Sequence, residues 1–213
     1  MVFFGLWNNA MVTLAMTLVA TILCMVIAVV VGVAMARKRS ADLLIRPILD
    51  AGQTIPAFVY LIPCLALFGP SRFTGIVAAL AYAAPVSIKL VADGVKGVSA
   101  TTMEAVRSSG ASTMQQIRKV QLPMAKASLM LATNQGLLFV LAMAVISGMV
   151  GAGALGYDVV IGFSRSEEWG KGFAAGATIV LLGIMIDRIA RRAAEAAPDQ
   201  WKRFPMRAPT GPF

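Results

Sequence analysis

The stretch AMVTLAMTLVATILCMVIAVVVGVAMA, residues 10–36, contains no charged side chain and decides which class of protein this is. A run of about 20 apolar residues is long enough, as a helix, to cross the roughly 30 Å hydrocarbon core of a bilayer. A cleaved signal peptide fits poorly, because residues 1–36 lack a basic start and run beyond the roughly 7–15 apolar residues of such a peptide. We therefore expect this stretch to remain as the first membrane span.

The composition of the whole chain also indicates a membrane protein. Hydrophobic residues make up 58% of the 213 residues and charged residues 14%, and the mean hydropathy is +0.78. In soluble domains charged residues reach about 25%. The absence of histidine excludes the HExxH zinc motif and Ser-His or Cys-His nucleophile pairs. Cys24 and Cys64 lie in apolar runs, so we expect no disulfide framework. We also expect no metal site and no enzymatic activity in this chain.

Five apolar segments are each near the length that a membrane-crossing helix needs. They are residues 10–36, 51–68, 73–91, 128–150 and 173–189. The second segment contains Pro56 and Pro63, which remove backbone donors and predict a bent helix buried in the bundle. The predicted fold is therefore all-α and polytopic, with a transmembrane domain over residues 1–197 and an irregular, basic, proline-rich tail over residues 198–213.

Basic residues indicate the orientation, because Lys and Arg are retained on the cytoplasmic side of short loops. Only Arg72, Arg165 and Lys171 of the 19 basic residues lie outside the first loop, the third loop with its flanks, and the tail. We therefore expect the N-terminus outside the cell and the C-terminus in the cytoplasm. Topology accounts for the net charge of +9, so we expect contact with membrane lipid and no nucleic-acid partner.

The polar loop over residues 93–126 carries the strongest functional signal, because long loops in compact proteins are usually functional. Thr101 stands three residues before Glu104, the spacing of a capping box, and predicts a short helix over roughly residues 102–109. Gly110 can adopt the left-handed conformation that ends this helix.

A second short helix is expected after that glycine. Ser112 can cap it, and it should run to about Val120. Pro123 is expected to stop this helix before the next span. The loop should then hold two short helices, folded at a glycine, across the cytoplasmic membrane face.

The spacing within this loop resembles the EAA loop of binding-protein-dependent ABC importer permeases. Glu104-Ala105 is followed by Gly110 six residues after the glutamate, and by Leu122-Pro123 with the proline nineteen residues after it. Val106 and Val120 replace the alanine and isoleucine that are usual in the family. The resemblance implies that the loop docks as a coupling helix on a separate ATP-hydrolysing subunit. The implied docking residues are Glu104, Ala105, Gly110, Val120, Leu122 and Pro123.

Further segments resemble the permeases of the glycine betaine/proline osmoprotectant class. They are RPILD at residues 46–50, QTIPAFVYLIP at 53–63, KVQLP at 119–123 and Asn134-Gln135. The resemblance covers roughly residues 13–191. It implies a type I importer permease for a compatible solute such as glycine betaine or proline, in the bacterial inner membrane.

The same resemblance implies the partners. They are two ATP-binding cassette subunits, which hold ATP and magnesium, a second permease chain that is identical or paralogous, and a separate extracytoplasmic substrate-binding protein. No cofactor is then expected in this chain, which also has no P-loop. Closure of the ATPase subunits would drive alternating access through the 93–126 loop.

The substrate path can be sought among polar and aromatic residues of the apolar segments, because a quaternary ammonium group is drawn to aromatic faces. Helix packing explains each aromatic residue equally well. The candidates are Phe58, Tyr60, Tyr82, Asn134, Gln135 and Phe139.

Residues 151–156, GAGALG, match GxGxxG formally, but they follow an apolar span instead of a strand, so a flexible turn on the outer face is the better interpretation. The segment 157–169 then either faces the binding protein and the outer gate or is an ordinary solvated loop.

Three other functions stay open. One is a permease for another small zwitterion or amino acid. Another is an ion-coupled secondary carrier, for which carboxylates along the path would be expected. Asp50, Asp93 and Asp187 lie near the predicted cytoplasmic span ends, which argues against it. The third is an assembly subunit whose partner carries out transport.

Overall fold

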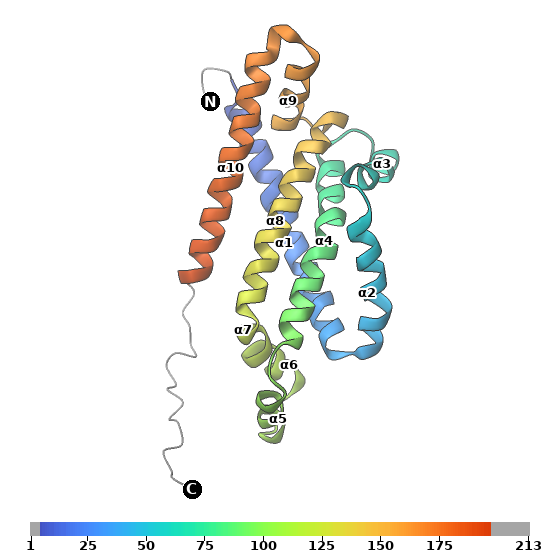
Figure 1. Cartoon of the computed structure of the whole chain (residues 1–213), viewed down its shortest axis with the longest axis vertical. Coiled ribbons are helices and arrows are strands. Elements are labelled where there is room, and N and C mark those ends of the chain that lie inside the picture. Colours follow the sequence, from blue (N-terminus) through green and yellow to red (C-terminus); the bar gives the residue numbers. More distant parts are fainter. Residues whose placement is uncertain (1–4, 197–213) are drawn as a thin grey trace.

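The computed structural model describes residues 5–196, and their side chains as far as residue 192 (Figure 1). This part of the chain is helical almost throughout and contains no strand, which confirms the all-α prediction. The predicted tail over residues 198–213 lies outside the described residues. Four long apolar helices run along the molecule: α1 (Trp7–Arg37), α4 (Arg72–Lys96), α8 (Lys126–Ser147) with the π-helical turn η3 (Gly148–Ala152), and α10 (Trp169–Ala196).

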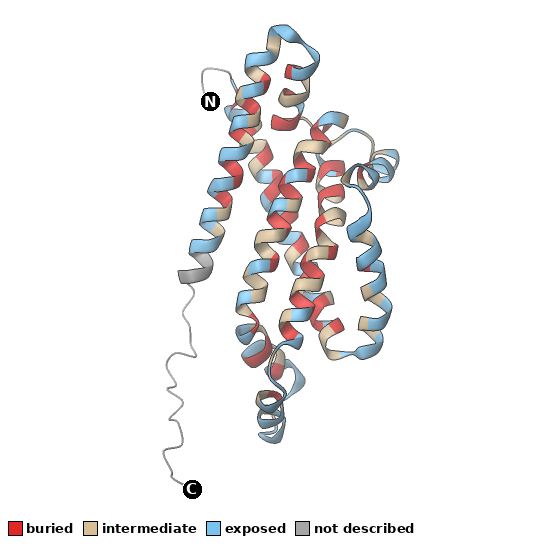
Figure 2. Cartoon of the chain, viewed as in Figure 1, coloured by how far each residue is buried: buried red, intermediate tan, exposed pale blue. Residues whose placement is uncertain are grey.

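The core lies where α1, α4 and α8 pack together, and Figure 2 shows buried residues on the facing sides of these helices. Small residues allow the close approach, as is usual between membrane helices. Ala78 and Ala83 of α4 are fully buried beside Cys24 of α1. A Cβ at Gly75 of α4 would lie only 2.8 Å from the Ser147 hydroxyl oxygen of α8. A larger side chain at Gly75 would push these helices apart.

The second predicted span, residues 51–68, differs in the structure. The chain forms α2 (Arg39–Thr54) and α3 (Ala57–Phe68), which meet at an angle of 100°. The break occurs because Pro56 disfavours the helical conformation of the residue before it, and Ile55 is extended with φ −76° and ψ 126°. Leu49 and Leu61 are the buried residues of these two helices, so the prediction of a single bent helix inside the bundle was wrong.

The segment after the glycine-rich turn is a helical hairpin. Gly151 and Gly153 have φ values of +92° and +72°, which glycine adopts readily, and α9 (Ala154–Ser164) follows them. The short 3₁₀ turn η4 (Ser166–Glu168) connects α9 to α10. Because α9 packs closely on α10 and several of its residues are buried, the alternative of a solvated loop is wrong.

A buried carboxylate fastens this hairpin to the start of α1. Asp158 of α9 is 2% exposed, accepts a hydrogen bond from the side-chain amide of Asn9 (2.6 Å), and pairs with the ammonium of Lys171 (3.0 Å). Nearby, the backbone N–H of Leu155 donates to the Thr13 hydroxyl (3.1 Å). Three helices are thereby connected at the end of the bundle where α1 begins.

Candidate functional site

The polar loop between α4 and α8 lies at the end of the molecule opposite the α9–α10 hairpin (Figure 1). Its first helix is α5 (Ala100–Ser108), and the hydroxyl of Ser99 accepts from the backbone N–H of Thr102 (3.3 Å). The predicted capping box of Thr101 and Glu104 is therefore wrong. The reason is that Ser99 provides an equivalent hydroxyl two residues earlier, so that Thr101 becomes part of the first helical turn.

The turn between the two loop helices agrees with the sequence-based expectation. Gly110 has φ +75°, which confirms the left-handed conformation. Ser112 caps α6 (Thr113–Gln116) in a capping box with Gln115. The backbone N–H of Ser112 donates to the Gln115 amide oxygen (2.8 Å), and the Gln115 N–H donates to the Ser112 hydroxyl (3.4 Å).

The second loop helix does not end at Pro123, contrary to the prediction. α6 continues through the π-helical turn η2 (Ile117–Gln121) and the short helix α7 (Leu122–Met124) into α8. Leu122 keeps helical angles, φ −65° and ψ −45°. Pro123 lies in the first turn of α7, a position where a helix has no use for a backbone donor. The second loop helix is therefore joined to the membrane helix α8 by an almost unbroken helical path.

Arg37, the last residue of α1, holds this helical path from the side. Its guanidinium donates to the amide oxygens of Gln121 (3.0 Å) and Gln116 (3.5 Å), and both glutamines are buried. Gln116 in turn donates to the Ala111 carbonyl (2.9 Å), next to the turn. Sequence reasoning missed this connection. The signal for it is the five-residue spacing of the glutamines, which matches one π-helical turn.

The six predicted docking residues separate into two groups. Glu104, Ala105, Gly110 and Pro123 are exposed. Val120 is 8% exposed and Leu122 packs against the core cluster of α1, α4 and α8. The exposed residues can touch a partner directly, whereas the two aliphatic side chains fasten the loop to the bundle.

The predicted pathway residues also separate. Tyr60, Tyr82 and Phe139 form one aromatic cluster, with ring centroids 5.6 Å apart between the tyrosines and 5.0 Å apart between Tyr82 and Phe139. The Tyr60 hydroxyl donates to the Gly52 carbonyl (2.5 Å), which connects α3 to α2 across the break.

The remaining pathway candidates lie apart from the aromatic cluster. Phe58 is 48% exposed on α3. Asn134 and Gln135 line a separate cleft between α8 and α10, where the Asn134 side-chain oxygen is buried with no hydrogen-bond partner among the described residues.

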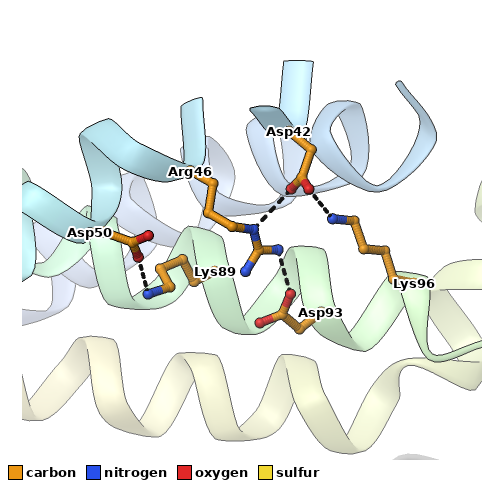
Figure 3. A network of polar contacts seen from close by, with 6 residues as sticks. All are labelled: Asp42, Arg46, Asp50, Lys89, Asp93 and Lys96. Atoms are coloured by element: carbon orange, nitrogen blue, oxygen red, sulfur yellow. Dashed lines mark hydrogen bonds and ion pairs between the residues drawn. The ribbon is translucent and has the colours of Figure 1, made fainter. Parts of the chain in front are cut away.

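Ion pairs fasten α2 to α4 along one side of the bundle (Figure 3). Arg46 bonds to Asp42 (3.2 Å) and to Asp93 (2.6 Å), and Asp42 also pairs with Lys96 (2.6 Å). Further along, Lys89 pairs with Asp50. We call these six residues the α2–α4 ion-pair network.

This ion-pair network was not predicted, although its signal is present in the sequence. Asp42, Arg46 and Asp50 recur every four residues, which places them on one face of a helix. What conceals the pairing is that the sequence alone does not show which helix lies opposite.

Comparison with known proteins gives a consistent result. Residues 25–195 match the protein family described as binding-protein-dependent transport system inner membrane component. The chain is 43% identical over 185 residues to the glycine betaine/proline betaine transport system permease protein ProW of Escherichia coli (strain K12), which covers 87% of this chain and 52% of that protein. It is 38% identical to the glycine betaine/carnitine transport permease protein GbuB of Listeria monocytogenes serotype 1/2a (strain 10403S), over 86% of this chain and 64% of that protein. The chain thus spans about half the length of ProW.

A solved structure supports the same assignment at the level of the fold. A chain in a structure of inward-facing conformations of the MetNI methionine ABC transporter superposes with a TM-score of 0.81 at 26% sequence identity. The superposition covers 91% of this chain and 96% of the other. The fold is that of a type I ABC importer permease, and the chain belongs to the family of binding-protein-dependent transport system inner membrane components.

Proposed function

We propose that this chain is the permease subunit of an ATP-driven importer for a compatible solute such as glycine betaine or proline. The observation that carries the proposal is the loop between α4 and α8. Its exposed tip presents Glu104, Ala105 and Gly110, and the helix behind the tip continues into a membrane span. The names of the relatives, which are permeases for glycine betaine, proline betaine or carnitine, support the substrate class.

Coupling to ATP hydrolysis follows from how the loop is attached. A partner ATPase that moves α5 would act on α8 through α6, η2 and α7, because these segments form a nearly continuous helix. It would also act on α1 through the bonds from Arg37 to Gln116 and Gln121. Two central helices of the bundle would then move together with the loop.

The assembly we propose contains two ATP-binding cassette subunits, a second permease chain and a separate substrate-binding protein. ATP and magnesium are held by the cassette subunits. The α5 end of the bundle faces the cytoplasm of a bacterium and the α9–α10 hairpin faces outward. The basic residues Arg107, Arg118 and Lys119 in the loop support this orientation, because such residues are retained on the cytoplasmic side.

The aromatic cluster of Tyr60, Tyr82 and Phe139 is the candidate contact for a quaternary ammonium group on the path. Its rings also hold α3, α4 and α8 together, so packing alone accounts for the cluster equally well. A Tyr82→Leu variant distinguishes the two roles. A pathway contact raises the solute concentration needed for half-maximal uptake, whereas a packing contact lowers only thermal stability.

The ion-coupled carrier is the weaker alternative. Asp50 pairs with Lys89 and Asp93 pairs with Arg46, so both carboxylates are neutralised by ion pairs between α2 and α4. A carboxylate that carries a transported ion must be able to exchange its partner.

Reconstitution tests the function directly. The chain is incorporated into liposomes with its ATPase and binding protein, and ATP hydrolysis is measured with glycine betaine, proline, carnitine and choline. Stimulation by one of these solutes, unchanged when ionophores collapse ion gradients, is the expected result. Uptake that needs an ion gradient and no ATP would refute the importer. Stimulation only by an unrelated solute would refute the compatible-solute assignment.

A further inference from the structure

A cleft of about 660 Å³ separates the first part of α8 from the last part of α10. In Figure 1, α10 stands away from α8 at this end of the bundle. The cleft has an apolar wall formed by Leu129, Met130, Leu131 and Ala190, and polar positions at Thr133, Asn134 and Gln135. Lys126 of α8 and Arg191 of α10 lie at its end. The docking loop and the aromatic cluster use none of these apolar residues.

The mouth of the cleft is strongly basic. Arg191 also lines an adjoining pocket of about 350 Å³ together with Asp187, Arg188 and Arg192. Arg191 bonds to the Asp187 carboxylate through its Nε (3.0 and 3.1 Å), so its two outer guanidinium nitrogens take no part in this ion pair. Arg188 and Arg192 form no ion pair within the described part of the chain. Among the described side chains at this mouth, Arg188, Arg191 and Arg192 outnumber the single carboxylate of Asp187, and this excess of positive charge favours an anion.

The interior of the cleft suits the part of a lipid below its phosphate group. Leu129, Met130 and Leu131 are apolar surface for acyl chains. A small water-soluble zwitterion would leave the apolar wall uncovered.

We propose that this α8–α10 cleft binds one anionic phospholipid, with its phosphate at Arg188 and Arg191 and its acyl chains against Leu129–Leu131. Charge complementarity at the mouth and the apolar wall together select this occupant, because anionic headgroups lie at the membrane surface where basic residues attract them. The proposed orientation places the lipid in the cytoplasmic leaflet. Only the choice of leaflet rests on the proposed function.

Lipid binding to the purified chain in detergent, followed by native mass spectrometry, tests the proposal. Dioleoyl phosphatidylglycerol is titrated against dioleoyl phosphatidylcholine. The intact chain should prefer phosphatidylglycerol. An Arg188→Gln/Arg191→Gln variant should bind this lipid about 30-fold more weakly, because it removes two basic residues and each typically contributes about 5-fold near a membrane surface. The matched control is Lys38→Gln/Arg39→Gln, which removes two exposed basic residues at the start of α2 and should retain the preference.

A second variant keeps the charge and fills the cleft. Thr133→Leu should reduce phosphatidylglycerol binding while circular dichroism and thermal unfolding stay close to those of the unaltered chain. Four results would overturn the proposal: equal binding of the two lipids, equal losses in the charge variant and its control, displacement by glycerol 3-phosphate, or displacement by glycine betaine. Displacement by glycerol 3-phosphate would indicate a phosphate site, and displacement by glycine betaine would place the cleft on the transport path. Since the assay contains neither ATPase nor binding protein, its result is independent of whether the chain imports a solute.

Discussion

Substitution of Gly110 gives the sharpest test of the docking loop. Gly110 has φ +75°, and a Cβ added there meets no atom within 4 Å. The cost of a side chain is therefore local backbone strain alone. An L-residue in the left-handed region costs roughly 1–2 kcal/mol, less for asparagine and more for a β-branched residue. Because about 1.4 kcal/mol corresponds to a tenfold change in population, Gly110→Ala should reduce the correctly folded turn about 5- to 30-fold against competing conformations.

The assay is solute uptake per ATP hydrolysed in liposomes that contain the complete transporter. We expect coupling to decrease in the order glycine, Gly110→Asn, Gly110→Ala, Gly110→Val, while the unfolding temperature of the chain falls by only a few degrees, as local strain of this size predicts. Gly97→Ala is the matched control, because Gly97 follows α4 with φ −69° and a Cβ there meets only ordinary contacts, the nearest at 3.4 Å. If Gly110→Val retains full uptake and full stimulated ATPase activity, the role assigned to this turn is wrong.

Three further predictions concern the bundle. Lys171→Met should lower the free energy of unfolding by about 3–5 kcal/mol, because it leaves the buried Asp158 carboxylate without its ammonium partner. In a double-mutant cycle measured by thermal unfolding, adding Asp158→Asn should restore part of this loss. Gly148→Ala should lower the free energy of unfolding by roughly 1–3 kcal/mol, because its Cβ would lie 2.5 Å from the backbone of α9. The control is Gly176→Ala, whose Cβ meets no atom within 4 Å and which should leave the unfolding temperature unchanged or raise it. Asp93→Asn should lower the unfolding temperature in dilute buffer, and this difference from the unaltered protein should shrink in 1 M salt, because salt screens ion pairs. An equal difference at both salt concentrations would argue against the α2–α4 ion-pair network as the cause.

Errors in the predicted site came from competition between neighbouring signals. Thr101 and Glu104 have the correct capping-box spacing, but Ser99 has a hydroxyl as well and begins the helix earlier. Pro123 is a helix breaker only where its missing N–H is needed, and the π-helical turn before it places it at a helix start. Either outcome is compatible with the local pattern. Which hydroxyl begins α5, and whether a π-helical turn precedes Pro123, is decided only in the folded structure.

The sequence by itself determined the approximate positions of the four long apolar helices, the left-handed turn at Gly110 and the Ser112 cap, because each depends on residues within a few positions of one another. Tertiary structure alone decided which distant residues meet: Arg37 with the glutamines of the loop, Asp158 with Lys171, and the ion pairs from α2 to α4. It also decided that α8 and α10 diverge to leave a cleft. The physical reason is that a helix pattern specifies which residues share a face, whereas the partner of that face is chosen by the packing of the whole bundle.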